Sequence, residues 1–251
     1  ALSYLRMPGS GRWLPVALAV STLIWPLQAL AGSVPRADLR QAYGAEVAAE
    51  TLLDAAPPRA LVLTAYYQTG FAVWSVRLLA GARPDLDHIH RTFLGQPGFV
   101  ANQRWREPRL RGLLAGARKP ADLDTRRLAP ELARRWVLFE FDDDTTGPPF
   151  VRHSLPLGLW RRLLPPGTPA AQVTADAQAA ARPWRALERR LAPYRDDPLT
   201  RMWLLWAYYL DARYHLHRDD CAGARFGWSR AVEIGNPQDP FLQRVQRQCR
   251  F

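Results

Sequence analysis

Lysine is almost absent from this chain of 251 residues. Lys119 is the only lysine, so nearly all of the 34 basic residues are arginines. Proteins that bind nucleic acid usually concentrate lysine and arginine in a stripe with interleaved glycines or aromatics. Here the arginines are scattered and include isolated doublets such as Arg126-Arg127 and Arg189-Arg190. The net charge of +11 therefore favours solvated helix faces or an anionic membrane surface, and we expect no nucleic-acid partner.

Cysteine is nearly as scarce, with Cys221 and Cys249 as the only 2 in the chain. Their number and spacing exclude zinc-finger patterns and a Cys-x-x-Cys redox motif. A disulfide between the last two helices is one interpretation if this part is exported, and two unpaired buried thiols are the other. No Ser/His/Asp or Cys/His set for nucleophilic catalysis is recognisable either. We expect no cofactor and no metal.

Charge is missing from the stretch between Arg12 and Arg36. Within it, Trp13–Gly32 is long enough to cross a hydrocarbon core of about 30 Å as a helix. The same residues also fit a signal peptide, with an apolar core and an Ala-x-Ala cleavage site at residues 29–31. We favour a membrane helix within residues 1–33. Both interpretations place residues 33–251 outside the cytoplasmic membrane, and a start at Ala1 suggests a longer parent protein.

Residues 34–167 are predicted to form a small α/β domain of three layers. Ala60–Thr64 is a short apolar run bounded by turn signals, which is typical of a strand covered on both faces. A helix over residues 69–79, ended by Gly81, and a strand over Leu86–Phe93 complete a βαβ unit. The other expected elements are a helix over residues 37–53, a helix over residues 120–135 that Pro130 interrupts, a strand at Trp136–Phe141 and a strand pair within residues 150–164.

The remaining residues, 168–251, show helical periodicity and no strand pattern, so we expect an all-α tail. Met202–His217, Ala222–Glu233 and Asp239–Arg250 are the predicted helices. The helix–turn–helix formed by the first two is similar to a single tetratricopeptide repeat. No second unit follows at the repeat period, so a lone helical hairpin that caps the α/β part is the preferred interpretation.

The loop after the first predicted strand is the expected place for a ligand, because open α/β sheets bind at the carboxyl ends of their strands. This loop, Ala65–Gly70, has no serine nucleophile, no glycine-rich phosphate cradle and no acid. Tyr66, Tyr67 and Gln68 could contact a sugar or a lipid headgroup. Packing over the sheet edge is the alternative for the two tyrosines.

Two further clusters carry titratable side chains. His88 and His90 share one face of the second predicted strand and could contribute to a ligand surface, although no third metal ligand accompanies them. Asp142–Asp144 follows the third predicted strand, where magnesium ligands often lie, but an ordinary solvated turn is the preferred interpretation.

A series of short motifs runs through residues 34–165: Ala37–Arg40, the strand Leu61–Thr64, Phe71 with Trp74, Arg83-Pro84-Asp85 and Pro156–Trp160. In this series the region resembles the soluble part that follows the last membrane helix in bacterial relatives of the transmembrane protein O-mannosyltransferase family. Members of that family are multi-pass membrane glycosyltransferases of GT-C type.

The resemblance implies a non-catalytic C-terminal part of such an enzyme on the periplasmic side of a bacterial inner membrane. Its partners would be the rest of the multi-pass protein, a lipid-linked sugar donor and an acceptor that the sequence does not identify. Tyr66-Tyr67 replaces the Gly-Asp pair of the family loop, and the catalytic acid of GT-C enzymes lies in a part with no counterpart here. A secreted or membrane-anchored periplasmic interaction module is the alternative, and a scaffold in an envelope complex is a third.

Overall fold

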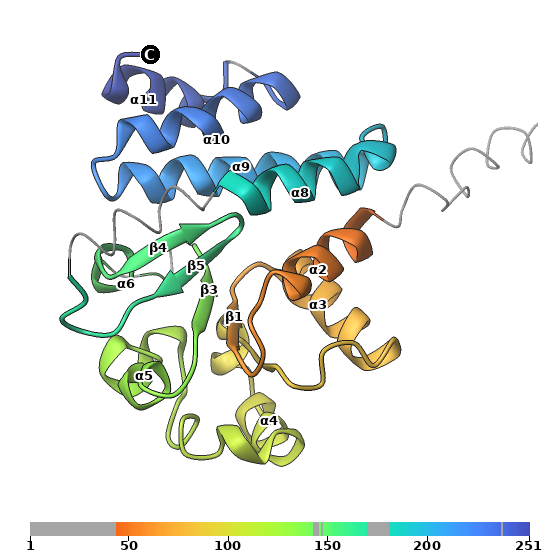
Figure 1. The fold of residues 1–251 in the computed structure, drawn as a ribbon, viewed down its shortest axis with the longest axis vertical. Helices are drawn as coiled ribbons and strands as arrows, with labels where there is room; N and C mark the ends of the chain where they lie inside the picture. Colours follow the sequence, from red (N-terminus) through yellow and green to blue (C-terminus); the bar gives the residue numbers. More distant parts are fainter. Residues whose placement is uncertain (1–43, 143–145, 147, 170–180, 237) are drawn as a thin grey trace, which may run out of the picture. The chain divides into compact units, whose positions relative to one another are not determined.

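The structure, a computed structural model, describes residues 44–251 except 143–145, 147, 170–180 and 237 (Figure 1). The described residues belong to one compact unit, which spans 43–251. The predicted membrane helix or signal peptide within residues 1–33 lies outside them. None of the helices in the described part of the chain is long and apolar enough to span a bilayer.

The described residues form a mixed α/β structure. Its strands are β1 (Leu61–Thr64), β2 (Asp87–His90), β3 (Val137–Glu140), β4 (Ser154–Leu157) and β5 (Trp160–Leu163). Its α-helices are α2 (Gly44–Asp54), α3 (Tyr67–Leu79), α4 (Phe99–Arg106), α5 (Thr125–Leu132), α6 (Pro148–Arg152), α8 (Ala181–Leu191), α9 (Pro198–Leu216), α10 (Cys221–Ile234) and α11 (Pro240–Cys249). Short 3-10 helices are η3 (Arg91–Gly95), η4 (Pro108–Leu110), η5 (Pro120–Asp122) and η7 (Ala192–Tyr194).

The strands form one five-stranded sheet in the order β2-β1-β3-β5-β4. β1 runs parallel to both β2 and β3, with Val62 opposite His88 on one side and Leu138 on the other. The predicted βαβ unit, β1–α3–β2, is thereby confirmed. β5 is antiparallel to β3 and forms a hairpin with β4, as expected for the strand pair within residues 150–164.

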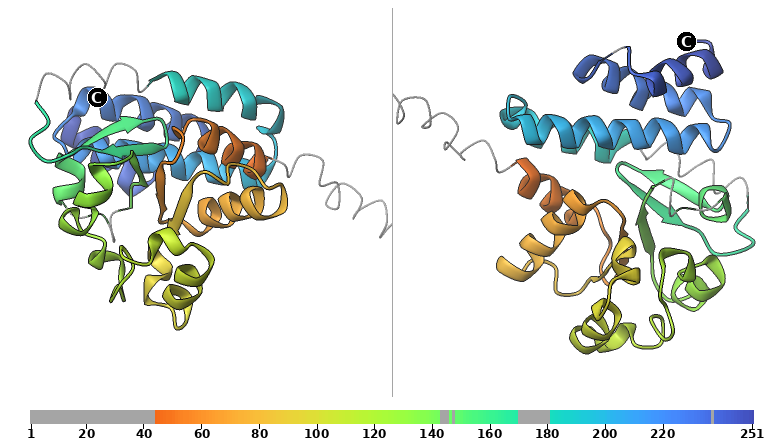
Figure 2. Two further views of the ribbon diagram at one scale, coloured as in Figure 1. Left: turned by 60° about the horizontal axis from the view of Figure 1, so that its bottom comes forward. Right: turned by 180° about the vertical axis from the view of Figure 1, so that it is seen from behind.

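Helices cover both faces of the parallel part of the sheet (Figure 2). On one face Val62 and Leu138 pack with α2 and with Val73 and Val76 of α3. On the other face the alternating strand residues meet the segment between β2 and β3. The buried residues of that second core include Leu61, Leu63, Ile89, Leu110, Leu114, Leu128 and Phe139. The three layers follow from strands that are apolar on both sides.

The C-terminal helices share the first of these cores. Trp184 and Leu187 of α8 and Trp203 and Leu204 of α9 are buried in the same cluster as residues of α2 and α3. Trp160 of β5 also belongs to it and donates a hydrogen bond from its Nε1 to the carbonyl of Leu52 in α2, at 2.8 Å. The sheet and the helical tail therefore have one core in common.

A disulfide joins Cys221, the first residue of α10, to Cys249, the last residue of α11, with the two Cα atoms 5.3 Å apart. The structure therefore has a disulfide here, and the alternative of two unpaired buried thiols is wrong. Trp228 of α10 adds a hydrogen bond from its Nε1 to the carbonyl of Leu242, at 3.0 Å. Both links hold α11 against the α9–α10 hairpin.

Three predicted elements need correction. The helix after the first strand begins at Tyr67 instead of residue 69, so only Ala65 and Tyr66 remain of the predicted loop Ala65–Gly70. The second strand ends at His90 instead of Phe93, because η3 begins at Arg91 and turns the chain away from the sheet. The helix expected over residues 120–135, with an interruption at Pro130, is instead divided into η5 and α5, and Pro130 lies inside α5. Asp124 separates them by accepting a hydrogen bond from the backbone N–H of Arg127 at 2.8 Å, which caps the start of α5.

Close packing of α9 on α10 depends on Gly227. A Cβ at this position would lie 2.6 Å from the carbonyl oxygen of Tyr208 and 2.8 Å from the backbone nitrogen of Ala212. Gly227→Ala is expected to reduce the free energy of unfolding by about 1–3 kcal/mol, because α10 must move away from α9. Urea unfolding measures the change. Gly112→Ala is the control, since no atom lies within 4 Å of its Cβ position, and equal stability of both variants would contradict the packing argument.

Candidate functional site

The carboxyl ends of β1 and β3 are the place where this topology would bind a ligand. The chain leaves β1 through α3 to β2 on one side, then returns across β1 to β3 on the other. Such a reversal of strand order opens a crevice at the carboxyl edge of a sheet, next to the N-terminus of a helix. Here the crevice lies between the loop that leads into α3 and the end of β3.

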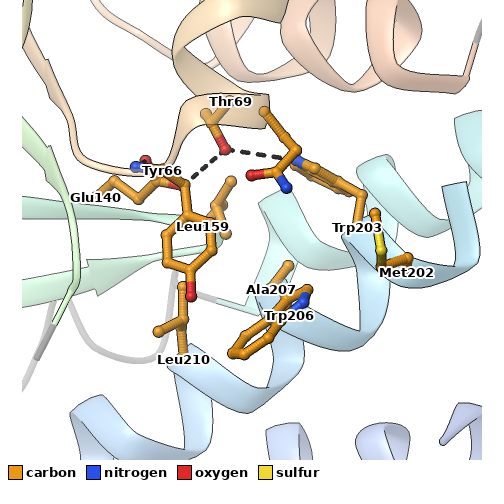
Figure 3. Close-up of a pocket in the computed structure, with 10 residues that line it drawn as sticks. Tyr66, Thr69, Glu140, Leu159, Met202, Trp203, Trp206, Ala207 and Leu210 are labelled. Atoms are coloured by element: carbon orange, nitrogen blue, oxygen red, sulfur yellow. Dashed lines mark hydrogen bonds between the residues drawn. The ribbon is translucent and has the colours of Figure 1, made fainter. Parts of the chain in front are cut away.

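The side chain of Glu140, the last residue of β3, occupies this position. Its Oε2 accepts hydrogen bonds from the backbone N–H groups of Ala65 and Tyr66, both at 2.9 Å. Its Oε1 accepts a third from the hydroxyl of Thr69 at 2.7 Å. Figure 3 shows Thr69 beside Glu140. The three donor groups would otherwise be available to an anion at the start of α3. The protein's own carboxylate thus takes the place of an external anion.

Glu140 is buried, and this burial raises the pKa of its carboxyl above the usual 4.5, against the opposing effect of its hydrogen bonds and of Arg91. The guanidinium of Arg91 donates to the main-chain carbonyl of Glu140 at 3.0 Å and to the hydroxyl of Thr146 at 2.9 Å. Carboxyl groups with a raised pKa are suited to proton transfer. In this case both oxygens are engaged with structural donors, so the arrangement favours a structural role.

A small pocket lies beside Glu140, between the start of α3 and α9 (Figure 3). Tyr66 packs on Trp206 with 5.7 Å between ring centroids, and Trp203 donates from its Nε1 to the hydroxyl of Thr69 at 3.4 Å. Trp206 remains 39% exposed. The lining residues are Tyr66, Gln68, Thr69, Glu140, Leu159, Met202, Trp203, Trp206, Ala207 and Leu210. Among them Glu140 is the only ionisable acid, so the pocket offers mainly aromatic and apolar contacts.

The residues expected to form a ligand surface separate into two places. Tyr66 and Gln68 line the pocket beside Glu140. Tyr67 lies in a different aromatic cluster, with 5.3 Å between the centroids of its ring and that of Phe93. Asp142–Asp144, the other candidate, falls mostly outside the described residues. Tyr66 and Gln68 therefore lie apart from Tyr67 and the histidines, and binding of a ligand by any of these residues stays a prediction.

His88 and His90 are fully buried beneath α3. A ring nitrogen of His88 lies 2.8 Å from the hydroxyl of Thr64, and His90 Nδ1 lies 3.3 Å from the carbonyl oxygen of the same residue. The edge of Trp74 faces both imidazoles, at 5.9 and 5.8 Å between centroids. Gly70 gives His90 its space, because a Cβ there would lie 2.7 Å from the ring.

Burial lowers the pKa of His88 well below 6.5 and lowers that of His90 to about 4. Both imidazoles are therefore neutral at physiological pH. The structure brings no third His, Cys, Asp or Glu to them, and no group of three that could hold a metal occurs in the described part of the chain. The two histidines act as packed polar residues of the sheet.

Glu140 is the residue of the site that the sequence prediction missed. It stands in the segment Trp136–Phe141, where every other residue is apolar. A single acid in a strand covered on both faces needs hydrogen-bond partners. Its presence in an otherwise apolar strand was the feature from which the sequence could have predicted a site here.

Comparison of the chain with known family models, curated proteins and solved structures yields no match.

The raised pKa of Glu140 leads to a prediction about pH. The folded state holds the proton more tightly than the unfolded state, so ionisation lowers stability as pH rises from about 4.5 through the raised pKa. Glu140→Gln removes this ionisation and keeps an acceptor oxygen for Ala65 and Tyr66. The free energy of unfolding of the wild type, relative to this variant, should fall as pH increases above 4.5. Urea unfolding between acidic and neutral pH measures it.

Glu140→Leu is the matched control, since it also removes the charge but leaves two backbone N–H donors and a hydroxyl without an acceptor. Its stability should lie below that of Glu140→Gln by about 2–5 kcal/mol at every pH. A wild-type advantage that grows with pH would show that the ionised carboxylate stabilises the fold, contrary to the prediction.

The lowered pKa of His90 has the opposite dependence on pH. Its stabilising effect is fully present above 6.5, the usual pKa, and is lost as pH falls towards about 4. His90→Phe should lose less stability than the wild type over this interval, by up to about 3 kcal/mol. Differential unfolding at several pH values measures the effect. Parallel curves for the two proteins would contradict burial of a neutral imidazole at this position.

Proposed function

We propose that this chain is a non-catalytic, extracytoplasmic part of a membrane glycosyltransferase that uses a lipid-linked sugar donor. In this role it positions an acceptor or stabilises the membrane domain. The apolar run Trp13–Gly32 would anchor it to a bacterial inner membrane as a transmembrane helix, with the bulk of the chain in the periplasm. The resemblance in residues 34–165 supplies the parent enzyme.

The hydrogen-bonded carboxylate of Glu140 is the observation that supports a non-catalytic role. Its oxygens, the N–H groups of Ala65 and Tyr66 and the hydroxyl of Thr69 satisfy one another. A reacting group at this edge would need to displace the acid from its donors. What remains accessible is the aromatic rim formed by Tyr66 and Trp206. Aromatic faces with a few polar neighbours suit binding of an acceptor better than chemistry on it.

The disulfide supports the periplasmic side. Disulfides persist in oxidising compartments and are rare where glutathione and thioredoxin keep thiols reduced. Cys221 and Cys249 close a loop with a sequence separation of 28 residues. The disulfide therefore favours export of the helical tail. Export is equally compatible with the alternative function, a secreted or membrane-anchored interaction module. A mature N-terminus at Gly32 would favour that alternative.

The test uses the complete protein encoded by the gene, in isolated membranes. Transfer of label from polyprenyl-phosphate mannose to membrane acceptors is followed for the wild type, Glu140→Gln and Tyr66→Ala combined with Gln68→Ala. We expect Glu140→Gln to keep the maximal rate within about twofold, because the residue makes no contact with the reacting atoms. The loop variant should raise the acceptor concentration for half-maximal rate about tenfold, because it removes uniform binding.

Two outcomes would overturn the proposal. One is a loss of the maximal rate in Glu140→Gln while the protein remains folded, which would make this carboxyl a catalytic group. The other is a gene that encodes no multi-pass region upstream of Ala1, which would remove the parent enzyme and leave the interaction module.

A further inference from the structure

An apolar surface lies along the outer side of α3 and α4. Leu79 is 85% exposed, Trp105 is 74% exposed and Leu78 is 63% exposed, and Phe71 and Tyr67 are at least half exposed. We call these five residues the α3–α4 face. They make up half of the large apolar side chains exposed in the described part of the chain. Exposed apolar surface on this scale indicates contact with another apolar phase or molecule.

Residues 67, 71, 74 and 78 follow helical spacing along α3, so they lie on one side of that helix, and Leu79 adjoins them as the last residue of α3. The rings of Phe71 and Trp74 are 5.7 Å apart, and those of Trp74 and Phe99 are 6.2 Å apart, which links α3 to α4. A groove of about 900 Å³ follows, with Leu78 and Trp105 among its lining residues.

Positive charge lies at the Trp105 end of the face. Residues 104–111 contain four arginines and one acid, Glu107, whose carboxylate pairs with Arg77 at 3.2 Å. Arg109 pairs with the buried Asp87 at 2.9 Å. The other arginines, Arg104, Arg106 and Arg111, have no acidic partner within the described ranges. The rim is therefore basic and has few local acids to neutralise it.

We infer that the α3–α4 face docks on an anionic lipid surface. Leucine, phenylalanine and tryptophan side chains enter the boundary between headgroups and acyl chains, and arginines beside them bind lipid phosphates. The long arginine side chains can lie along the apolar surface with their charged ends at the headgroups. The charge of the rim, opposite to that of anionic lipids, favours a bilayer over a protein partner. This inference goes beyond the proposed function and does not depend on the identity of the parent enzyme.

The test places an environment-sensitive fluorophore, NBD, on the face itself. Leu79→Cys is labelled in the full chain without reductant, so that the pair Cys221–Cys249 stays bonded. Ser229→Cys, an exposed position on α10 at the other end of the described structure, carries the label in the matched control (Figure 1). Both proteins are mixed with phosphatidylcholine vesicles, with or without phosphatidylglycerol.

With phosphatidylglycerol present, we expect a several-fold rise and a blue shift of the emission at position 79 and no change at position 229. High salt should reduce the response. Arg104→Gln with Arg106→Gln, added to the protein labelled at 79, should weaken vesicle binding at least about fivefold. Both side chains are exposed, so thermal unfolding should be unchanged.

Each alternative result would overturn the inference. No response at position 79, or equal responses at 79 and 229, would mean that the face does not contact the bilayer even if residues 13–32 insert. Equal responses on both kinds of vesicle, or none lost in the double-glutamine variant, would reject anionic lipid as the partner.

Discussion

The carboxylate of Glu140 is the interaction on which the carboxyl edge of the sheet depends. It connects the end of β3 to the N–H groups that open α3 and to the hydroxyl of Thr69. Thr69 in turn accepts a hydrogen bond from Trp203 of α9. One buried series of hydrogen bonds thus runs from the sheet to the helical tail. Because the acid is already at the helix N-terminus, the donor groups with which other open α/β sheets bind ligands serve here to hold the layers together.

A second buried contact has the same effect farther along the sheet. Arg161 of β5 pairs with Asp211 of α9 at 2.7 Å, and its guanidinium lies 4.3 Å from the ring centroid of Tyr214. The hydroxyl of Tyr214 reaches the carbonyl of Ser154 in β4 at 3.1 Å. Removal of either charge would leave the other buried and unpaired, which costs about 3–5 kcal/mol. All strands of the described structure precede the predicted boundary at residue 167, and only helices follow it. The core nevertheless contains residues from both sides of this boundary.

Local patterns in the sequence were sufficient for most elements. Ala60–Thr64 was predicted as a strand because turn signals bound a short apolar run, and the helices of the tail followed from their periodicity. The role of Glu140 could not be predicted in this way, because its partners, Ala65, Tyr66 and Thr69, are 71 to 75 positions earlier in the chain. Alternation correctly placed His88 and His90 on one face of β2. It could not show that α3 covers that face, which depends on the absence of a side chain at Gly70.

The excess of arginine has a structural explanation in one part of the molecule and none in another. Arg77 donates a hydrogen bond to the carbonyl of Leu86, and Gln103 donates one to the carbonyl of His88, so both side chains bind the outer edge of β2. Arg109 and Arg135 neutralise the buried Asp87. A guanidinium suits such tasks because it stays charged and donates several hydrogen bonds in a fixed plane. The acids near this edge strand, Asp87 and Glu107, are therefore already paired with Arg77, Arg109 and Arg135. The arginines of α4 consequently have few acids beside them, so the positive charge near this edge is concentrated around the apolar α3–α4 face.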